Sequence, residues 1–199
     1  MTSTGATSAG ATSASTVKVL GIGGSLRDGS QTERALRIAL DGAAEAGADT
    51  SAISGQALDL PFYDAVSLER TPRASELVEA VREADGLIVV SPGYHGALSG
   101  LIKNALDYLE DLRADRRPYL DGRAVGVVGV AYGWQAAVTT LDQLRTITHA
   151  LRGWPTPLGG AVNTGEVKFD VDGGASEEKV ERTLRLIGTQ VTEFAQRRA

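Results

Sequence analysis

Short apolar runs alternate with amphipathic stretches along most of the chain. Runs that are rich in β-branched residues and bounded by glycine predict buried strands, whereas apolar positions at spacings of three and four predict helices. The expected strands cover residues 17–22, 50–53, 86–91, 124–131 and 158–162. The expected helices cover residues 30–46, 72–84, 100–112, 135–151 and 180–194. This alternation indicates an α/β fold, a doubly wound five-stranded parallel sheet in a three-layer α/β/α sandwich.

The N-terminal segment differs in composition from the rest of the chain. Residues 1–16 are almost all Ser, Thr, Ala and Gly, so we expect a disordered tail there and a single domain over residues 17–199. The tail has no basic segment followed by an apolar core, and it has no arginine. Neither a secretory signal nor an organellar transit peptide is therefore expected, which favours a cytoplasmic protein.

Charge and composition argue against several functional classes. The formal net charge is −5, and the body of the chain has no basic run longer than Arg116-Arg117, so nucleic acid is a poor partner. No run approaches the roughly 18 consecutive apolar residues of a membrane span. The chain has no cysteine, and its two histidines, His95 and His149, lie far apart, so disulfides, thiol chemistry and a histidine-rich zinc site are not expected. Any redox chemistry therefore needs a bound cofactor.

The most informative segment is residues 24–32, Gly-Ser-Leu-Arg-Asp-Gly-Ser-Gln-Thr, between the first strand and the first helix. A glycine-rich turn at a helix N-terminus collects free backbone N–H groups and the positive end of the helix dipole, which suits a phosphate. Arg27 and the hydroxyls of Ser25, Ser30 and Thr32 add further donors. The alternative is an ordinary turn in which Ser30 only caps the helix, with Glu33 three residues on as in a capping box.

The same loop lacks the signatures of the common nucleotide-binding motifs. A dinucleotide fingerprint that starts at Gly21 needs glycine at position 26, where this chain has leucine. A phosphate loop of the Walker type that starts at Gly24 needs lysine at position 30, where this chain has serine. A terminal monophosphate is therefore the ligand that we expect.

A second segment follows the third expected strand and completes a family resemblance. Residues 91–100 read Ser-Pro-Gly-Tyr-His-Gly-Ala-Leu-Ser-Gly, and the next helix begins Leu-Ile-Lys-Asn-Ala-Leu-Asp. Together with residues 24–30 they resemble the NADPH-dependent FMN reductase family, whose pattern is Gly-Ser-x-Arg-x-x-Ser, then Pro-x-Tyr, then Ser/Pro-Gly before Leu-Lys-Asn-x-Leu-Asp. The resemblance covers residues 24–107, and it implies a flavodoxin-like fold that binds FMN.

The resemblance also implies three groups of cofactor-binding residues. The FMN phosphate would be held by Ser25, Arg27, Ser30, Gln31 and Thr32. The isoalloxazine ring would lie along Pro92, Gly93, Tyr94, His95 and Gly96. Backbone amides after the fourth strand would meet the pyrimidine edge of the ring, at Tyr132, Gly133, Trp134 and Gln135. The commonest family pattern has asparagine where this chain has Thr32, so FMN is expected to be held loosely enough to exchange.

Three ring-bearing side chains also have plainer interpretations. Tyr94 is expected either beside the flavin, which we favour, or as a plain core aromatic at the base of its loop. His95 is expected either at the carbonyl edge of the flavin or the nicotinamide, or in solvent. Trp134 either packs against its neighbours or stacks near the site or in an oligomer contact, and the sequence does not decide between these roles.

The expected function is that of an NAD(P)H-dependent FMN reductase. A hydride would pass from NADPH or NADH to flavin N5, without a catalytic acid–base residue, and a partner monooxygenase would use the reduced flavin. The alternatives are an FMN-containing reductase of quinones, azo compounds or metal oxyanions, a non-enzymatic flavodoxin-like electron carrier, and a phosphate-binding module without redox activity. The segment 101–112 carries apolar stripes on two sides, which together with the resemblance predicts a homodimer or homotetramer.

Overall fold

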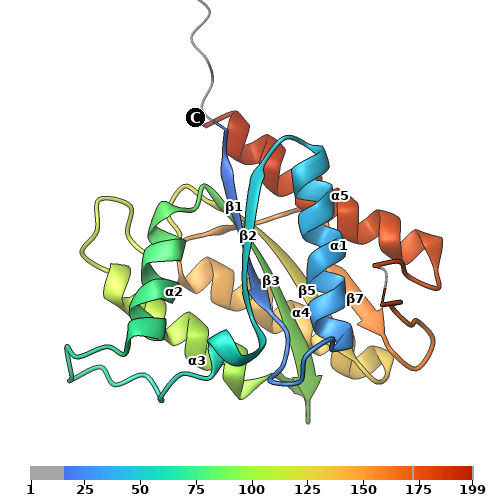
Figure 1. Ribbon diagram of the computed structural model, residues 1–199, viewed down its shortest axis with the longest axis horizontal. Helices are drawn as coiled ribbons and strands as arrows, with labels where there is room; N and C mark the ends of the chain where they lie inside the picture. Colours follow the sequence, from blue (N-terminus) through green and yellow to red (C-terminus); the bar gives the residue numbers. More distant parts are fainter. Residues whose placement is uncertain (1–15, 172, 199) are drawn as a thin grey trace, which may run out of the picture.

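The structure is a computed structural model that describes residues 16–171 and 173–198, so the expected tail lies outside it except for Thr16. Within these residues, strands and helices alternate, as Figure 1 shows. The strands are β1 (Lys18–Gly23), β2 (Asp49–Ser54), β3 (Gly86–Tyr94), β4 (Ala97–Leu98), β5 (Ala124–Ala131), β6 (Trp154–Pro155) and β7 (Gly160–Asn163). The helices are α1 (Gln31–Glu45), α2 (Pro72–Glu83), α3 (Gly100–Asp107), α4 (Trp134–Ala150) and α5 (Glu178–Gln196), with short 3₁₀ helices η1 (Gly55–Leu58) and η2 (Tyr108–Leu112).

The strands form one sheet in the order β2-β1-β3-β5-β6, with β7 also paired to β5 and β4 paired to β3. All of these pairs are parallel except β3 with β4. The chain moves from β1 outwards to β2 and then crosses to β3 on the other side of β1, so strand order reverses between β1 and β3. This order is that of a flavodoxin-like fold, and it confirms the fold class that the sequence predicts.

The number of strands corrects the prediction, since the sheet has seven strands and not five. One addition is β4, which forms a hairpin with the end of β3. The other arises because β6 and β7 share the fifth position, where both pair with β5. Between them, residues 156–159 face only residues 126–127 of β5, so the strand is broken by a bulge.

The break in the fifth strand has a local cause. Pro157 lies in the bulge, and proline has no N–H to donate to a sheet ladder. Arg145 of α4 instead donates to the carbonyls of Thr156 at 3.2 Å and of Pro157 at 3.1 Å. The N–H of Thr156 still donates to Val125 of β5 at 3.0 Å, whereas the carbonyls of Thr156 and Pro157 are satisfied by the side chain of Arg145.

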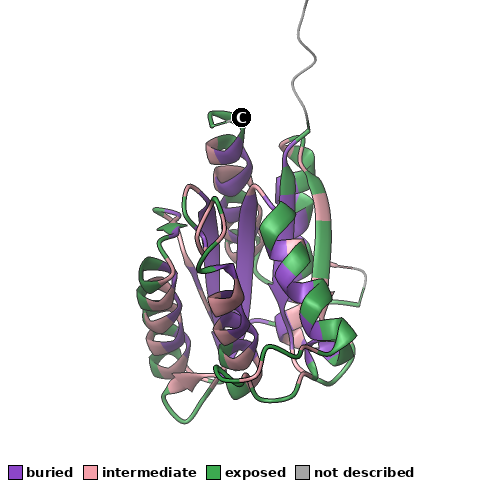
Figure 2. Ribbon diagram, turned by 90° about the vertical axis from the view of Figure 1, so that its left-hand side faces the viewer, coloured by how far each residue is buried: buried purple, intermediate pink, exposed green. Residues whose placement is uncertain are grey.

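Two hydrophobic cores lie on opposite faces of the sheet because successive side chains of a strand point to opposite sides. Val19 and Ile88 are buried on the face that α1 and α5 cover. Leu20 and Leu87 are buried on the face that α2, α3 and α4 cover. Figure 2 shows the buried sheet between these helix layers. The three-layer sandwich thus follows directly from the alternation in β1 and β3.

The helix that was expected over residues 100–112 consists of α3 and η2, and its apolar stripes are covered within the same chain. Its buried members are Ile102, Ala105, Leu106, Leu109 and Leu112. Leu101 is partly buried against the same core. The wide apolar arc is therefore part of the core that α2 also lines. It gives no support to a helix pair between protomers, and the homo-oligomer remains a prediction.

Candidate functional site

The candidate site lies at the carboxyl ends of the parallel strands, the lower edge in Figure 1. The loops after β1, β3 and β5 emerge side by side because these strands are neighbours, with Gly23 paired to Val90 and Pro92 paired to Val130. In open α/β sheets, ligands bind at this edge where strand order reverses. The structure thus brings all three predicted groups of site residues to one edge of the sheet.

The loop after β1 has the shape of an anion cradle. Gly24 and Gly29 have φ values of 102° and 64°, which let the chain turn tightly into α1. The Oγ atom of Ser30 accepts the N–H of Glu33 at 3.2 Å and so caps α1, as predicted. The N–H groups of the first turn of α1 have no carbonyl partner within the helix and point into the loop.

Four side chains of this loop can donate to an anion. The hydroxyl of Ser25, which is half-buried, accepts the N–H of Arg27 at 3.4 Å and keeps its own proton to donate. Arg27 is exposed, and its guanidinium has no hydrogen bond or ion pair within the residues that the structure describes. The hydroxyl of Ser30 accepts the capping bond and keeps its own proton to donate. Thr32 is 5% exposed, and its hydroxyl has no hydrogen-bond partner among the described residues. Every fully buried side-chain polar atom of these residues has a partner, so the hydroxyl of Thr32 is not fully buried. Asp28, whose charge would repel an anion, is exposed.

Two polar side chains near the cradle are already engaged. The Oε2 atom of Glu33 accepts the N–H of Gly29 at 2.8 Å, and not the N–H of Ser30 that a capping box would use. Gln31 Oε1 accepts the N–H of Phe169 at 2.9 Å, and its Nε2 donates to the carbonyl of Phe169 at 3.4 Å. The amide of Gln31 therefore ties α1 to the segment before α5, and only its backbone N–H faces the loop.

The loop after β3 is a tight hairpin. Tyr94 pairs with Ala97, and the two turn residues, His95 and Gly96, have φ values of 50° and 85°. Positive φ at both central residues is typical of a two-residue type I′ hairpin. Tyr94 is 55% exposed and His95 is exposed, so both rings face solvent at the site. The alternative of a core position for Tyr94 is therefore wrong.

The base of the hairpin packs closely on α4. A Cβ atom at Gly93 would lie 2.4 Å from Thr140 Oγ1, so only glycine fits there. Gln143 of α4 clamps the two sides of the turn, because its Oε1 accepts the N–H of Leu98 at 2.9 Å and its Nε2 donates to the carbonyl of Gly96 at 2.9 Å. The hairpin is thus held in one position relative to the loop that begins α4.

The loop after β5 presents backbone donors. Gly133, with φ at 108°, is the N-cap of α4, and its N–H donates to Asn163 Oδ1 at 2.7 Å. Because this N–H is occupied, the free N–H groups nearest the loop are those of Trp134 and Gln135, in the first turn of α4. Tyr132 and Trp134 are 86% and 49% exposed. The ring of Tyr132 is almost fully exposed, and the indole of Trp134 is engaged with Glu166 at 2.9 Å, so backbone groups are what this loop offers a ligand.

The donor set of the edge fits a flavin mononucleotide. Arg27, the hydroxyls of Ser30 and Thr32 and the N-terminus of α1 suit a phosphate dianion. The N–H groups at the start of α4 suit the carbonyl groups of a flavin ring. One feature opposes the fit, because the carboxylate of Glu33 adds negative charge inside the cradle. Apart from this carboxylate, the residues present fit the group.

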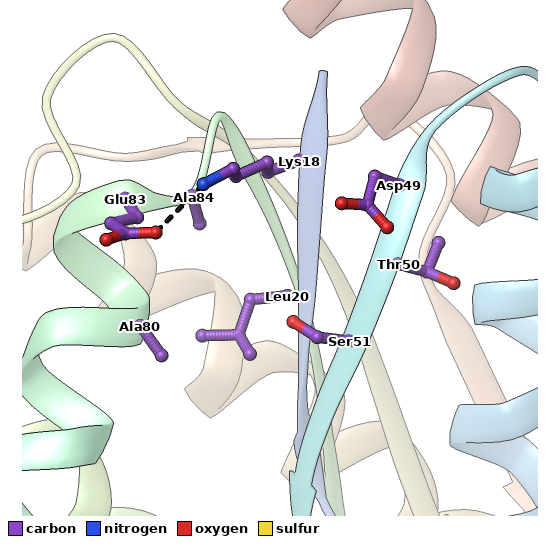
Figure 3. A pocket seen from close by; sticks show the side chains of 8 residues that line it. All are labelled: Lys18, Leu20, Asp49, Thr50, Ser51, Ala80, Glu83 and Ala84. Atoms are coloured by element: carbon purple, nitrogen blue, oxygen red, sulfur yellow. Dashed lines mark hydrogen bonds and ion pairs between the residues drawn. The ribbon is translucent and has the colours of Figure 1, made fainter. Parts of the chain in front are cut away.

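Two hollows lie away from the first two loops. One, of about 200 Å³, lies at the amino ends of β1 and β2 and is shown in Figure 3. It is lined by Lys18, Leu20, Asp49, Thr50, Ser51, Ala80, Glu83 and Ala84. The Lys18–Glu83 ion pair, 2.9 Å long, raises the pKa of Lys18 and lowers the pKa of Glu83. The other, of about 330 Å³, lies between Trp134, β7 and α5. Neither is lined by a residue of the loop after β1.

Two further observations concern the part of the chain that the structure describes. None of its helices has the length and apolar character needed to cross a membrane. It also holds no group of three or more His, Cys, Asp or Glu side chains placed to bind a metal ion.

Three residues of the site escape the sequence predictions. The sequence marks Glu33 only as a helix cap, whereas it also bonds the loop. Gln143 lies 45 and 47 residues from its partners, so no local pattern reveals it. Asn163 directly follows the last expected strand, where the rule that ligands bind at carboxyl ends offers a signal.

Comparison with known proteins identifies the family of the chain. Residues 17–167 match the model of the family of NADPH-dependent FMN reductases. The NAD(P)H-dependent FMN reductase of Pseudomonas aeruginosa is 32% identical over 178 residues, which cover 85% of this chain and 90% of that protein. The FMN-dependent NADPH-azoreductase of Staphylococcus aureus is 31% identical over 121 residues, which cover 60% of this chain and 61% of that protein.

A solved structure supports the fold independently. An oxidoreductase from Corynebacterium diphtheriae superposes with a TM-score of 0.68 at 18% identity, covering 90% of this chain and 97% of that one. At this identity, the likeness shows the architecture alone. The family match over residues 17–167 and the 32% identical relative show the family as well as the architecture. This chain therefore belongs to the NADPH-dependent FMN reductase family, as an NAD(P)H-dependent flavin oxidoreductase that uses FMN.

Proposed function

We propose that this enzyme reduces FMN with NADPH or NADH and releases the reduced flavin to a partner monooxygenase. The observation that carries the proposal is the open cradle after β1. Arg27 has no ion-pair partner among the described residues. The hydroxyl of Thr32 has no hydrogen-bond partner among them, and it lies beside the free N–H groups of α1. FMN, when bound, supplies a ring whose N5 accepts a hydride from a reduced nicotinamide.

The residues of the chain hold and orient the reactants. Arg27 and the hydroxyl groups of Ser30 and Thr32 bind the phosphate of FMN. Tyr94 and His95, both exposed on the hairpin, border the ring. The N–H groups at the start of α4 donate to its pyrimidine edge. No side chain has to carry a proton in the hydride step, so orientation and local charge are what the protein contributes.

Two features of the loop after β1 are expected to weaken the binding of FMN, which supports release of the reduced flavin. Threonine at position 32 replaces the amide that the family pattern most often has. The carboxylate of Glu33 lies in the same loop, bonded to Gly29 at 2.8 Å, and repels a phosphate dianion. Both features lower the affinity for FMN, and an enzyme that delivers reduced flavin must let it leave.

The proposal is tested on purified protein by titration with FMN and by following the oxidation of NADPH and NADH. We expect oxidation that depends on added FMN, sequential kinetics in the two substrates, and loss of yellow colour on dialysis. A protein that neither binds FMN nor oxidises either nucleotide when FMN is added would overturn the proposal. Direct oxidation in this single-protein assay also separates the enzyme from an electron carrier that another protein reduces.

The use of the reduced flavin is tested separately. A flavin-dependent monooxygenase is supplied with the protein, NADPH and catalytic FMN, and its product is measured. Product formation that rises with the amount of the reductase supports delivery of free reduced flavin. No product, with FMN reduction intact, would contradict the monooxygenase partner and leave the reductase proposal standing.

Reduction of an azo compound, a quinone or a metal oxyanion is the second candidate function. The similarity to an azoreductase favours it, and the exposed rings of Tyr94 and His95 leave room for an aromatic acceptor beside the flavin. In this case FMN stays bound, so the purified protein is yellow and its kinetics are ping-pong. Bleaching of an azo dye by the dialysed protein, without added FMN, would favour this function over the first.

A homodimer or homotetramer is part of the same proposal. The loop between η1 and α2 exposes Phe62, Val66 and Leu68 at 91%, 90% and 94%. Large apolar side chains that gather on an exposed loop commonly mark a protein interface. Light scattering of the purified protein measures the assembly, and a monomer at micromolar concentration would contradict it.

A further inference from the structure

A chain of hydrogen bonds connects the end of β7 to the loop that begins α4. Asn163, 6% exposed, accepts two backbone N–H groups on Oδ1, from Gly133 at 2.7 Å and from Gly165 at 3.0 Å. Its Nδ2 donates to Glu166 Oε1 at 2.8 Å. The indole of Trp134 donates to the same Glu166 oxygen at 2.9 Å. One buried side chain therefore fixes the N-cap of α4 and the residue that follows it.

Only an asparagine serves all of these contacts at position 163. The two N–H groups need an oxygen with two lone pairs, and the carboxylate of Glu166 needs a donor. Aspartate accepts both N–H groups but turns a second carboxylate towards Glu166. An apolar side chain leaves the N–H of Gly133 without its partner.

We propose that Asn163 is a positioning residue for flavin binding, which acts through Gly133 and is kept in its orientation by Glu166. The inference rests on the proposed function, since it assumes that the ring meets the start of α4. Because Asn163 occupies the N–H of Gly133, it sets the direction of the next N–H groups, those of Trp134 and Gln135. These groups are the donors assigned above to the pyrimidine edge.

The test exchanges the amide of position 163 with the carboxylate of position 166. In Asn163→Asp, the carboxylates of positions 163 and 166 repel each other across a hydrogen-bond distance. In the double variant Asn163→Asp, Glu166→Gln, the amide is on the other partner. The two bonds that meet at one oxygen of Glu166 then divide between two atoms of the glutamine, since its Nε2 donates to the aspartate and its Oε1 accepts from Trp134. Asn104→Asp is the matched control, because Asn104 also bonds backbone groups, at Tyr63 and Pro61, but lies on α3.

Two readouts are measured on each variant. The first is the dissociation constant of FMN, which we expect to rise about tenfold in Asn163→Asp and to return to within about threefold of the wild type in the double variant. The second is the fluorescence of Trp134 in a Trp154→Phe background, which makes Trp134 the single tryptophan of the chain. Its emission should shift in Asn163→Asp and recover in the double variant. Asn104→Asp should change neither readout.

The outcomes separate this inference from the proposed function. If the wild type does not bind FMN, the proposed function fails first. If the wild type binds FMN and Asn163→Asp binds it equally well, or if the double variant restores no affinity, the positioning role is overturned. Should Asn163→Asp not fold, Glu166→Ala decides the question, because position 166 is exposed. Unchanged FMN affinity and Trp134 fluorescence in Glu166→Ala would overturn the role, and weaker binding with shifted fluorescence would support it.

Discussion

The Oε2 atom of Glu33 accepts the backbone N–H of Gly29 at 2.8 Å, so α1 inserts a carboxylate into the loop proposed to bind a phosphate. The bond completes the turn, and it occupies an N–H group that a phosphate could otherwise use. Glu33 also lies at the N-terminal end of α1, where the helix dipole favours negative charge. The same residue therefore stabilises the empty loop and competes with its ligand.

Removing this charge should tighten FMN binding. Glu33→Gln keeps an oxygen that accepts from Gly29 and loses the negative charge, so we expect the dissociation constant of FMN to fall several-fold, for a gain of about 1 kcal/mol. Fluorescence titration with FMN at low salt measures the effect. Glu178→Gln, an exposed position in the first turn of α5, is the control and should not change affinity. Weaker binding in Glu33→Gln would show that loop order outweighs repulsion.

Removing Arg27 should weaken FMN binding. A hydrogen bond between a guanidinium and a phosphate contributes about 1.5–3 kcal/mol, so Arg27→Ala is expected to raise the dissociation constant about 10- to 150-fold. Arg182→Ala provides the comparison, because Arg182 is exposed on α5 and pairs only locally, with Glu178. If Arg27→Ala binds FMN as the wild type does, Arg27 is not a phosphate ligand.

The hydroxyl of Thr32 should contribute to affinity without contributing to stability. Thr32→Val keeps the branched shape and removes the donor, so we expect FMN to bind about 2- to 12-fold more weakly, for a loss of about 0.5–1.5 kcal/mol. The melting temperature should stay within the error of the wild-type value, because the hydroxyl has no partner among the described residues. Thr32→Asn adds an amide donor and should shift affinity in the opposite direction. Equal binding by all three proteins would remove Thr32 from the site.

Two glycines of the hairpin should respond differently to alanine. At Gly93 a Cβ atom would meet Thr140 Oγ1 at 2.4 Å, so Gly93→Ala should lower the free energy of unfolding by about 1–3 kcal/mol and displace the hairpin from α4. At Gly96 nothing lies within 4 Å of such an atom, and only its positive φ of 85° is unfavourable, so Gly96→Ala should cost about 1 kcal/mol. Urea unfolding compares the two. A larger loss at Gly96 would contradict the close packing at Gly93.

Arg123 should be the most costly single arginine to remove. It is 1% exposed and donates to the carbonyls of Ala84 at 2.8 Å, Tyr119 at 2.9 Å and Arg82 at 2.9 Å, which closes the C-terminal end of α2. Burial lowers the pKa of Arg123 to about 10, because the charged form is separated from water. Arg123→Ala leaves these carbonyls without the donor, and we expect a loss of about 3–5 kcal/mol in urea unfolding.

A second variant separates the carbonyl contacts of Arg123 from its bulk. Arg123→Met fills most of the same volume without a charge, so it should lose less stability than Arg123→Ala. FMN affinity should be the same in both variants and in the wild type, since Arg123 precedes β5 at the end remote from the site. Equal stability of Arg123→Ala and the wild type would show that water replaces the guanidinium at no cost.

The sequence predicts those parts of the fold that depend on local pattern. Periodicity predicts the alternation of strands and helices, and the cap Ser30 is found where α1 begins. It does not predict β4, because that strand exists only through the positive φ values of His95 and Gly96. Nor does it predict β6, because that strand has two residues and pairs with only two residues of β5.

The candidate site is likewise predicted where it depends on local pattern, and not where it depends on contacts between distant residues. The order of motifs brings the right loops together, since parallel strands end at one edge. Which group of a residue serves a ligand depends on its neighbours in space. The amide of Gln31 is bonded to Phe169, and the N–H of Gly133 is bonded to Asn163, each far away in the sequence. Such long-range partners leave no periodic signal, so the sequence identifies the site residues by position and not by role.

The bulge between β6 and β7 preserves the side of the sheet to which each side chain of β7 points. It sets four residues, 156–159, against two residues of β5, so the excess is an even number. Since strand side chains alternate between faces, an even excess keeps Val162 pointing into the core, where it is 2% exposed, and delivers Asn163 to the N-cap of α4. A single added or deleted residue would turn β7 over and send the amide away from the cofactor loop. The connection between β6 and β7 therefore needs an even number of extra residues more than it needs one exact length.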